Sequence, residues 1–208
     1  MAYSDFSLAS VKKTFNLTIS SQKDLFSGVS PLPYSNLLKE TLDYNVPFAL
    51  ASNTEKSRSE MIIAPILLEV TKKCAHQISL FSGVDFHVDK EQGLNGTCDF
   101  MISRSSELLI ISAPVILIVE AKRENINLGL GQCVAEMYGA KLFNQEEGNE
   151  ISRIYGVVTT GEVWKFLRLE EDKVEIDLGE YFLNEVNKIL GILVSAVGEY
   201  SEGLGAGD

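Results

Sequence analysis

The chain has 208 residues, of which 45% are hydrophobic, 23% charged and 9% aromatic. These fractions are typical of one folded domain and exclude disordered, collagenous and low-complexity chains. A chain of this length buries roughly 70% of its unfolded surface, so it needs no metal or disulfide to hold its core. The net charge of −11 disfavours non-specific binding to nucleic acid or to anionic membranes.

The acidic residues are unevenly distributed along the chain. Residues 1–145 carry 13 Lys and Arg against 15 Asp and Glu, a net charge of −2. Residues 146–208 carry 5 against 14, a net charge of −9. Because the excess acid belongs to the C-terminal third, the first two thirds remain compatible with a polyanionic ligand.

Cysteine spacing and hydropathy indicate the compartment. Cys74, Cys98 and Cys133 lie far apart, without the CxxC spacing of a zinc site, so we expect free buried thiols. The N-terminus lacks the basic and apolar regions of a secretory signal. No apolar run approaches the roughly 20 residues that span a bilayer. We therefore expect a cytoplasmic protein with no membrane partner.

The N-terminal quarter mixes short apolar pieces with Ser, Pro and Gly. We expect residues 1–50 to form an arm packed on the core, residues 51–200 to form the main domain, and residues 201–208 to form a flexible tail. Two capping-box patterns precede a helical apolar pattern, which predicts a helix from about residue 54 to the high 70s. Pro65 either kinks this helix or lies close to its regular start.

Several later apolar stretches are bounded by turns in the manner of strands. They are residues 84–88, 96–103, 115–122, 154–160 and 163–169, with a weaker candidate at 174–178. The first three predict an antiparallel meander. Apolar spacing predicts helices from 128 to about 143 and from about Tyr181 onward. This order predicts an α/β fold with a mixed β-sheet flanked by helices.

One strand ends in charged side chains after an apolar run. Glu120 and Lys122, separated by Ala121, follow Val115–Val119, and the period of two puts both charges on one face. Asp99 in the preceding strand is expected beside Glu120 across the sheet. Two carboxylates that close repel each other unless they are protonated or bridged by a cation. Oxygen ligands without His or thiolate favour Mg²⁺ or Mn²⁺.

These residues form a recognisable pattern. Asp99 is followed about twenty residues later by Glu120-x-Lys122, then by Gln132 in the next helix, while Glu60 lies in a preceding helix. The pattern resembles that of the PD-(D/E)XK nuclease superfamily. Within it, the chain is most similar to restriction-endonuclease-like bacterial proteins.

The resemblance covers roughly residues 54–170 and implies a restriction-endonuclease-like αβββαβ core, the order of elements expected above. Cys98 occupies the position of the proline in the family name. The net negative charge also differs from relatives that bind duplex DNA through a basic surface.

The resemblance implies a Mg²⁺- or Mn²⁺-dependent hydrolase that cleaves phosphodiester bonds in nucleic acid, above all DNA. Asp99, Glu120 and the backbone carbonyl of Ala121 would hold the metal. Lys122 would orient the attacking water and stabilise the transition state.

Two further residues complete the implied site. Gln132 would hydrogen-bond the water or Lys122, and Glu60 would support the metal from outside, through a water molecule. Glu69 is an alternative helical carboxylate, which we expect at the surface.

Other interpretations stay open at this point. Glu120 and Lys122 could form only a cross-strand salt bridge, and Asp99 could be a polar residue at a strand edge. The whole chain could be a catalytically silent nuclease-like module that binds a protein partner or nucleic acid; the acidic C-terminal third favours that alternative. A homodimer is plausible for either, since a chain this short has little room for sequence-specific recognition.

Overall fold

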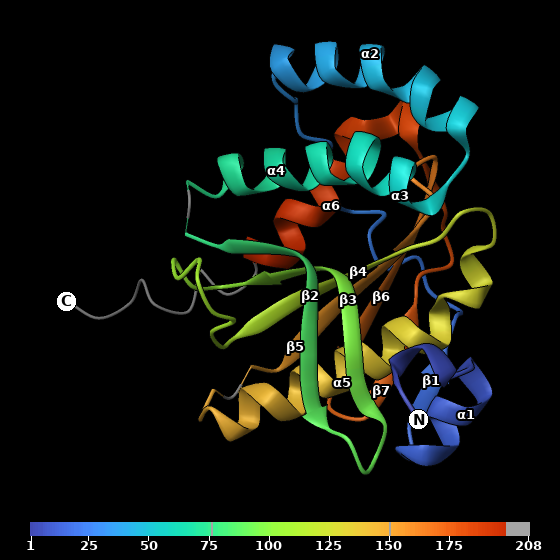
Figure 1. Ribbon diagram of the computed structural model, residues 1–208, viewed down its shortest axis with the longest axis vertical. Helices are drawn as coiled ribbons and strands as arrows, with labels where there is room; N and C mark the ends of the chain where they lie inside the picture. The colour runs from blue at the N-terminus through green and yellow to red at the C-terminus, as the bar shows by residue number, and fades with distance from the viewer. Residues whose placement is uncertain (76, 150, 199–208) are drawn as a thin grey trace.

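The computed structural model describes residues 1–75, 77–149 and 151–198, and its centre is a mixed eight-stranded β-sheet (Figure 1). The strands are β1 (Thr18–Ser20), β2 (Ser79–Asp89), β3 (Leu94–Ser103), β4 (Val115–Ala121), β5 (Arg153–Thr159), β6 (Val163–Glu170), β7 (Lys173–Ile176) and β8 (Tyr181–Phe182). Their order is β1-β7-β6-β5-β4-β3-β2, with β8 paired to β6. The prediction of an α/β fold with a mixed sheet is therefore confirmed.

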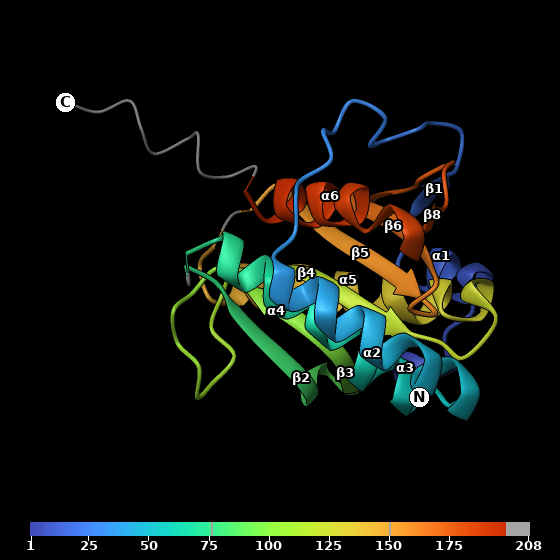
Figure 2. The same cartoon turned by 90° about the horizontal axis from the view of Figure 1, so that it is seen from above.

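Helices cover both faces of the sheet. The α-helices are α1 (Leu8–Thr14), α2 (Asn36–Ser52), α3 (Glu55–Arg58), α4 (Ala64–Lys73), α5 (Leu130–Glu146) and α6 (Val186–Gly198). Shorter turns are η1 (Tyr3–Asp5), the π-helical η2 (Ser59–Ile63), η3 (Ile126–Leu128) and η4 (Leu183–Glu185). Figures 1 and 2 show α2, α4 and α6 on one side of the sheet, with α5 and α1 on the other. Each side has its own hydrophobic cluster.

The centre of the sheet follows the expected pairing. Strands β2, β3 and β4 form the predicted antiparallel meander, and β4 pairs in parallel with β5 after the α5 crossover. All seven residues of β4 are buried, because helices cover this strand on both faces. The predicted strand at 84–88 begins five residues earlier, at Ser79.

The predicted helix from residue 54 is three consecutive pieces. It begins at α3, passes through the π-helical turn η2 and continues as α4 to Lys73. Pro65 lies in the first turn of α4, where its missing N–H costs little. A π-helical turn closes i→i+5 hydrogen bonds, so the residues of α4 are rotated about the helix axis relative to those of α3.

The first fifty residues contribute more than an arm. Strand β1 extends the sheet by pairing in parallel with β7, and α2 is a 17-residue helix that spans the predicted boundary at residue 50. Tyr3, Phe6 and Val11 belong to the cluster around α5. The sequence pattern missed α2, whose apolar residues are weakly periodic and which contains Pro47.

Glu69 corrects another expectation. It was expected at the surface, but only 7% of it is exposed. Its carboxylate accepts hydrogen bonds from the backbone N–H and the Oγ of Ser35, both at 2.8 Å. Ser35 is the N-cap of α2, so Glu69 joins α4 to the start of α2.

The C-terminal region differs in one detail from the prediction. Tyr181 and Phe182 pair with β6 as β8, which delays the last helix to Val186. The predicted tail at residues 201–208 lies outside the described residues. Within those described, no helix has both the length and the apolar character that crossing a bilayer requires.

Candidate active site

The charged pair at the end of β4 has the predicted arrangement. Glu120 is 1% exposed, and Lys122 Nζ donates a hydrogen bond to Glu120 Oε1. The backbone N–H of Lys122 donates to the carbonyl of Thr159 at 2.8 Å, at the end of β5. Both side chains therefore sit on a backbone that the central sheet holds in place.

Asp99 reaches the same place from β3. The pairing of β3 with β4 ends at Phe100 opposite Val119. One residue further on, Asp99 Oδ2 accepts the backbone N–H of Ala121 at 2.8 Å. A side-chain hydrogen bond thus replaces the next bond of the strand pairing and brings the Asp99 carboxyl beside Glu120.

Burial disfavours the ionised form of both carboxyl groups, and the charge of Asp99 adds to this effect at Glu120. Burial, and then the charge of Asp99, raise the pKa of Glu120 to about 8, although Lys122 acts to lower it. Burial also raises the pKa of Asp99, against the hydrogen bond from Ala121 and the charge of Lys122. Such a pair retains a proton or takes up a cation.

Lys122 stays protonated despite its partial burial. Desolvation acts to lower its pKa, but Glu120, Glu55 and Asp99 together outweigh that effect, and the net shift of the pKa is upward. Its side chain also reaches α5, where Nζ lies 3.4 Å from Gln132 Oε1. The ammonium group is therefore held between β4 and the first turns of α5.

Gly129 makes room for the Lys122 side chain. A Cβ at this position would lie 2.7 Å from Val158 Cγ1 and 3.1 Å from both Cγ and Cε of Lys122. Gly129 immediately precedes α5. The absent side chain thus lets the start of α5 approach Lys122 closely, and a larger residue would displace Val158 and crowd Lys122.

A second buried glutamate lies behind Gln132. Glu136 is fully buried, and its Oε1 accepts a hydrogen bond from Gln132 Nε2 at 3.1 Å. Burial, followed by the charge of Glu120, raises the pKa of Glu136 well above its ordinary value. We did not predict Glu136 from the sequence, although its spacing of four residues from Gln132 puts both on one helical face.

Glu60 is not brought to this group. It is exposed and forms an ion pair with Lys56 at 2.9 Å. Glu55, one turn earlier, is the helical carboxylate whose charge acts on both Glu120 and Lys122. The capping pattern at Thr54 was the available signal, because it places Glu55 in the first helical turn.

Arg58 connects α3 to the loop after β5 through hydrogen bonds. Its Nη1 donates to the carbonyl of Thr160 and to Glu162 Oε2, both at 2.8 Å. Its Nη2 donates to Asn53 Oδ1 at 3.1 Å. Because Thr160 directly follows β5, these bonds tie α3 to the end of the sheet that carries Glu120.

The donor set suits a hard divalent cation. Glu120 Oε2 is buried and has no hydrogen-bond partner among the described residues, so one carboxylate oxygen beside Asp99 is available. Across the same residues, no group of three or more His, Cys, Asp and Glu side chains is arranged to hold a metal. Mg²⁺ is commonly bound by one or two carboxylates together with waters and substrate phosphates, and Asp99 and Glu120 fit that mode.

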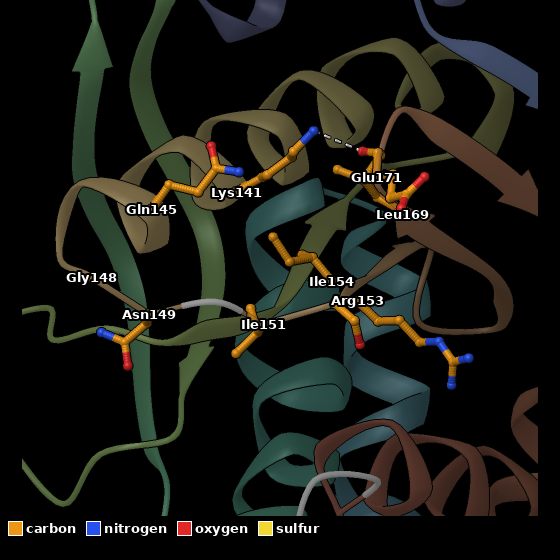
Figure 3. A pocket seen from close by; sticks show the side chains of 10 residues that line it. Lys141, Gln145, Gly148, Asn149, Ile151, Arg153, Ile154, Leu169 and Glu171 are labelled. Carbon is orange, nitrogen blue, oxygen red and sulfur yellow. Dashed lines mark hydrogen bonds between the residues drawn. The ribbon is translucent and has the colours of Figure 1, made fainter.

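One hollow of the surface lies away from this site. Figure 3 shows this space of about 630 Å³, with Lys141 of α5 and Arg153 and Ile154 of β5 among its lining residues. Arg153 begins β5, whereas Val158, the partner of Glu120, is near its end. Lys141 Nζ already bonds the carbonyl of Glu171 and Asp172 Oδ1. The hollow is thus at the opposite end of the sheet from the carboxylate pair.

Comparisons with known proteins add no assignment. A scan against protein-family models and searches of curated proteins and solved structures returned no significant match. The functional conclusion therefore rests on the fold and on the arrangement of Asp99, Glu120, Lys122 and Gln132.

Proposed function

We propose that this protein is a divalent-metal-dependent nuclease of the PD-(D/E)XK type that hydrolyses phosphodiester bonds in DNA. The observation that carries the proposal is one juxtaposition. Lys122 contacts Glu120 and Gln132 beside the close carboxyl groups of Glu120 and Asp99, at the end of a buried strand.

The order of elements supports the same proposal. Helix α4 is followed by β2, β3 and β4, then by α5 and β5, which is the αβββαβ order that the resemblance implies. The site residues come from β3, β4 and α5, the elements on which the motif expects them.

In the proposed site, Asp99, Glu120 and the backbone carbonyl of Ala121 would hold Mg²⁺ or Mn²⁺. When bound, such a cation lowers the pKa of a coordinated water and neutralises charge that develops on the phosphodiester.

The chain's own groups supply the remaining functions. Lys122, kept protonated beside Glu120, would donate hydrogen bonds to the attacking water or to a phosphate oxygen as negative charge develops. Gln132 Oε1 would limit the positions open to the Lys122 ammonium. Glu120, whose pKa is about 8, must release its proton before its carboxylate can ligate a cation.

The test is a cleavage assay with matched lysine variants. Purified protein is incubated with circular and linear duplex DNA, single-stranded DNA and RNA, in Mg²⁺, Mn²⁺ or EDTA. We expect metal-dependent cleavage of DNA that Lys122→Ala reduces by about 10²- to 10³-fold, since one stabilising charge at the transition state is removed.

Lys56→Ala is the matched control, because Lys56 is an exposed lysine that pairs with Glu60. It should leave cleavage unchanged. Cleavage by Lys122→Ala at the rate of the unmodified protein would overturn the proposal, and cleavage of RNA alone would correct the substrate.

A second candidate is a catalytically silent module that binds a protein partner or nucleic acid. It is favoured by the acidic C-terminal third and by the pairing of two exposed cations, Lys56 and Arg123, with Glu60 and Glu124. A rise in melting temperature with Mg²⁺ that Asp99→Ala abolishes, without cleavage of any substrate, would support this candidate.

A further inference from the structure

Glu136 is a buried acid that the proposed chemistry does not use. It lies in the middle of α5, fully inaccessible to solvent. Oε1 accepts from Gln132 Nε2 at 3.1 Å, whereas Oε2 has no hydrogen-bond partner among the described residues. A buried carboxyl group with an unpartnered oxygen is costly. An apolar side chain of similar size would avoid that cost. We therefore ask what the hydrogen bond between Glu136 and Gln132 contributes.

The contact determines which way the Gln132 amide faces. Lys122 Nζ can only donate hydrogen bonds, so it requires the amide oxygen. Glu136 Oε1 accepts, so it requires the amide nitrogen. The observed orientation, with Oε1 at 3.4 Å from Lys122 and Nε2 at 3.1 Å from Glu136, satisfies both. Rotating the amide by 180° would place its Nε2 donor against the ammonium donors of Lys122, and its oxygen could then bond Glu136 only through a proton on that carboxyl group.

The helix that carries both residues is held rigidly. A Cβ on Gly131 would collide with the backbone of Phe6 and Ser7, and one on Gly139 would lie 2.5 Å from Tyr3 Oη. The N-terminal segment therefore packs directly on α5 at glycines flanking Gln132 and Glu136. With the backbone held, the remaining freedom at Gln132 is that of its own side chain, which Glu136 restrains.

We infer that Glu136 is a positioning residue, which holds the Gln132 amide with its oxygen toward Lys122 and thereby restrains the Lys122 ammonium from the α5 side. The orientation itself follows from contacts within this chain. Its consequence for cleavage rests on the proposed nuclease function, so the experiment has one readout that needs no cleavage.

That readout is the side-chain amide of Gln132, followed by nuclear magnetic resonance on ¹⁵N-labelled protein. The signal is assigned by its loss in Gln132→Leu. In the unmodified protein and in Glu136→Gln, which keeps an acceptor oxygen, the Nε2 protons should exchange slowly with water. In Glu136→Leu they should exchange roughly tenfold faster, as expected for the loss of one hydrogen bond. If Glu136→Leu does not fold, Glu136→Met replaces it in the same exchange measurement.

Cleavage kinetics provide the second readout. Glu136→Leu should lower kcat by about tenfold with KM unchanged, because Lys122 acts in the transition state, and Glu136→Gln should restore kcat to within about twofold. Asn144→Ala is the matched control. It removes buried bonds from Asn144 to the backbone of Val115 at the other end of α5, so it should lower Tm without lowering kcat below the melting transition.

The outcomes are distinguishable. Unchanged amide exchange in Glu136→Leu overturns the inference, as does failure of Glu136→Gln to retain slow exchange. If exchange responds as expected while the unmodified protein cleaves no substrate, the positioning role stands and the nuclease proposal fails. If exchange responds but kcat does not, the inference is overturned for Lys122, because the amide would then be oriented without restraining the ammonium.

Discussion

Glu120 on β4 and Glu175 on β7 are both buried in the same sheet, yet their carboxyl groups have opposite electrostatic surroundings. Glu175 accepts hydrogen bonds from Lys173 at 2.7 Å and from Arg168 at 2.5 Å, and these lower its pKa to about 2. Glu120 has one cationic partner, Lys122, and its pKa rises to about 8.

The comparison separates a structural carboxylate from a candidate catalytic one. At Glu175 the positive charges exceed the single negative charge, so the ionised form is stable without a ligand. At the end of β4, Asp99 and Glu120 share Lys122, and one buried oxygen of Glu120 has no partner among the described residues. An excess of buried acidic groups over cationic side chains is the feature expected where a cation binds.

The largest expected effect on stability concerns Glu120. Its folded pKa of about 8 exceeds the ordinary 4.5, so its contribution to stability is complete below about pH 4.5 and is lost as the pH rises through 8. In EDTA, Glu120→Gln should therefore melt several degrees above the unmodified protein at pH 9 and at the same temperature at pH 4.5. Melting curves across this range, followed by circular dichroism, test this; a constant difference at all pH values would contradict it.

Glu175 should behave in the opposite sense. Its folded pKa of about 2 lies below the ordinary 4.5, so its contribution is present above about pH 4.5 and is lost as the pH falls toward 2. Glu175→Gln should cost roughly 3 kcal/mol of unfolding free energy at pH 7, an upper figure from the pKa difference. Urea titrations at pH 7 and pH 3 measure this. An equal loss at both pH values would show that packing, rather than charge, is responsible.

A smaller effect is expected at Gly129, which sharpens the comparison by moving Lys122 without changing its charge. A Cβ there would overlap Val158 Cγ1 and crowd Lys122, so Gly129→Ala should reduce cleavage by about tenfold, as a small misplacement of a catalytic group does. Gly28→Ala is the control, because no atom lies within 4 Å of its added Cβ. Equal cleavage by both variants would show that Lys122 tolerates displacement.

The smallest effects are expected on α3 and the turn after it. Glu60→Gln should change both cleavage and stability by no more than a surface substitution does, about 0.5 kcal/mol, because Glu60 is exposed beside Lys56. A larger response from Glu60→Gln would restore Glu60 to the site.

Glu55→Gln should lower the pKa of Glu120 slightly, since Glu55 acts to raise it. The pH dependence of melting in EDTA measures that shift.

Alternation and apolar periodicity were enough to predict the central part of the fold. The buried run of β4 with Glu120 and Lys122 at its end, the meander before it and the helix that carries Gln132 all follow from local patterns. The period of two is a property of every strand, so the shared face of Glu120 and Lys122 was independent of the exact strand boundaries.

Other features depended on the tertiary structure. Sequence spacing alone does not show that the β3–β4 pairing stops at Phe100 and frees the Ala121 N–H for Asp99. Nor does it show that Glu69 turns inward to Ser35, that Glu55 rather than Glu60 acts on the site, or that Glu136 is buried behind Gln132. Strand register and helix rotation are set by how whole elements pack, whereas a local pattern specifies only which residues share a face.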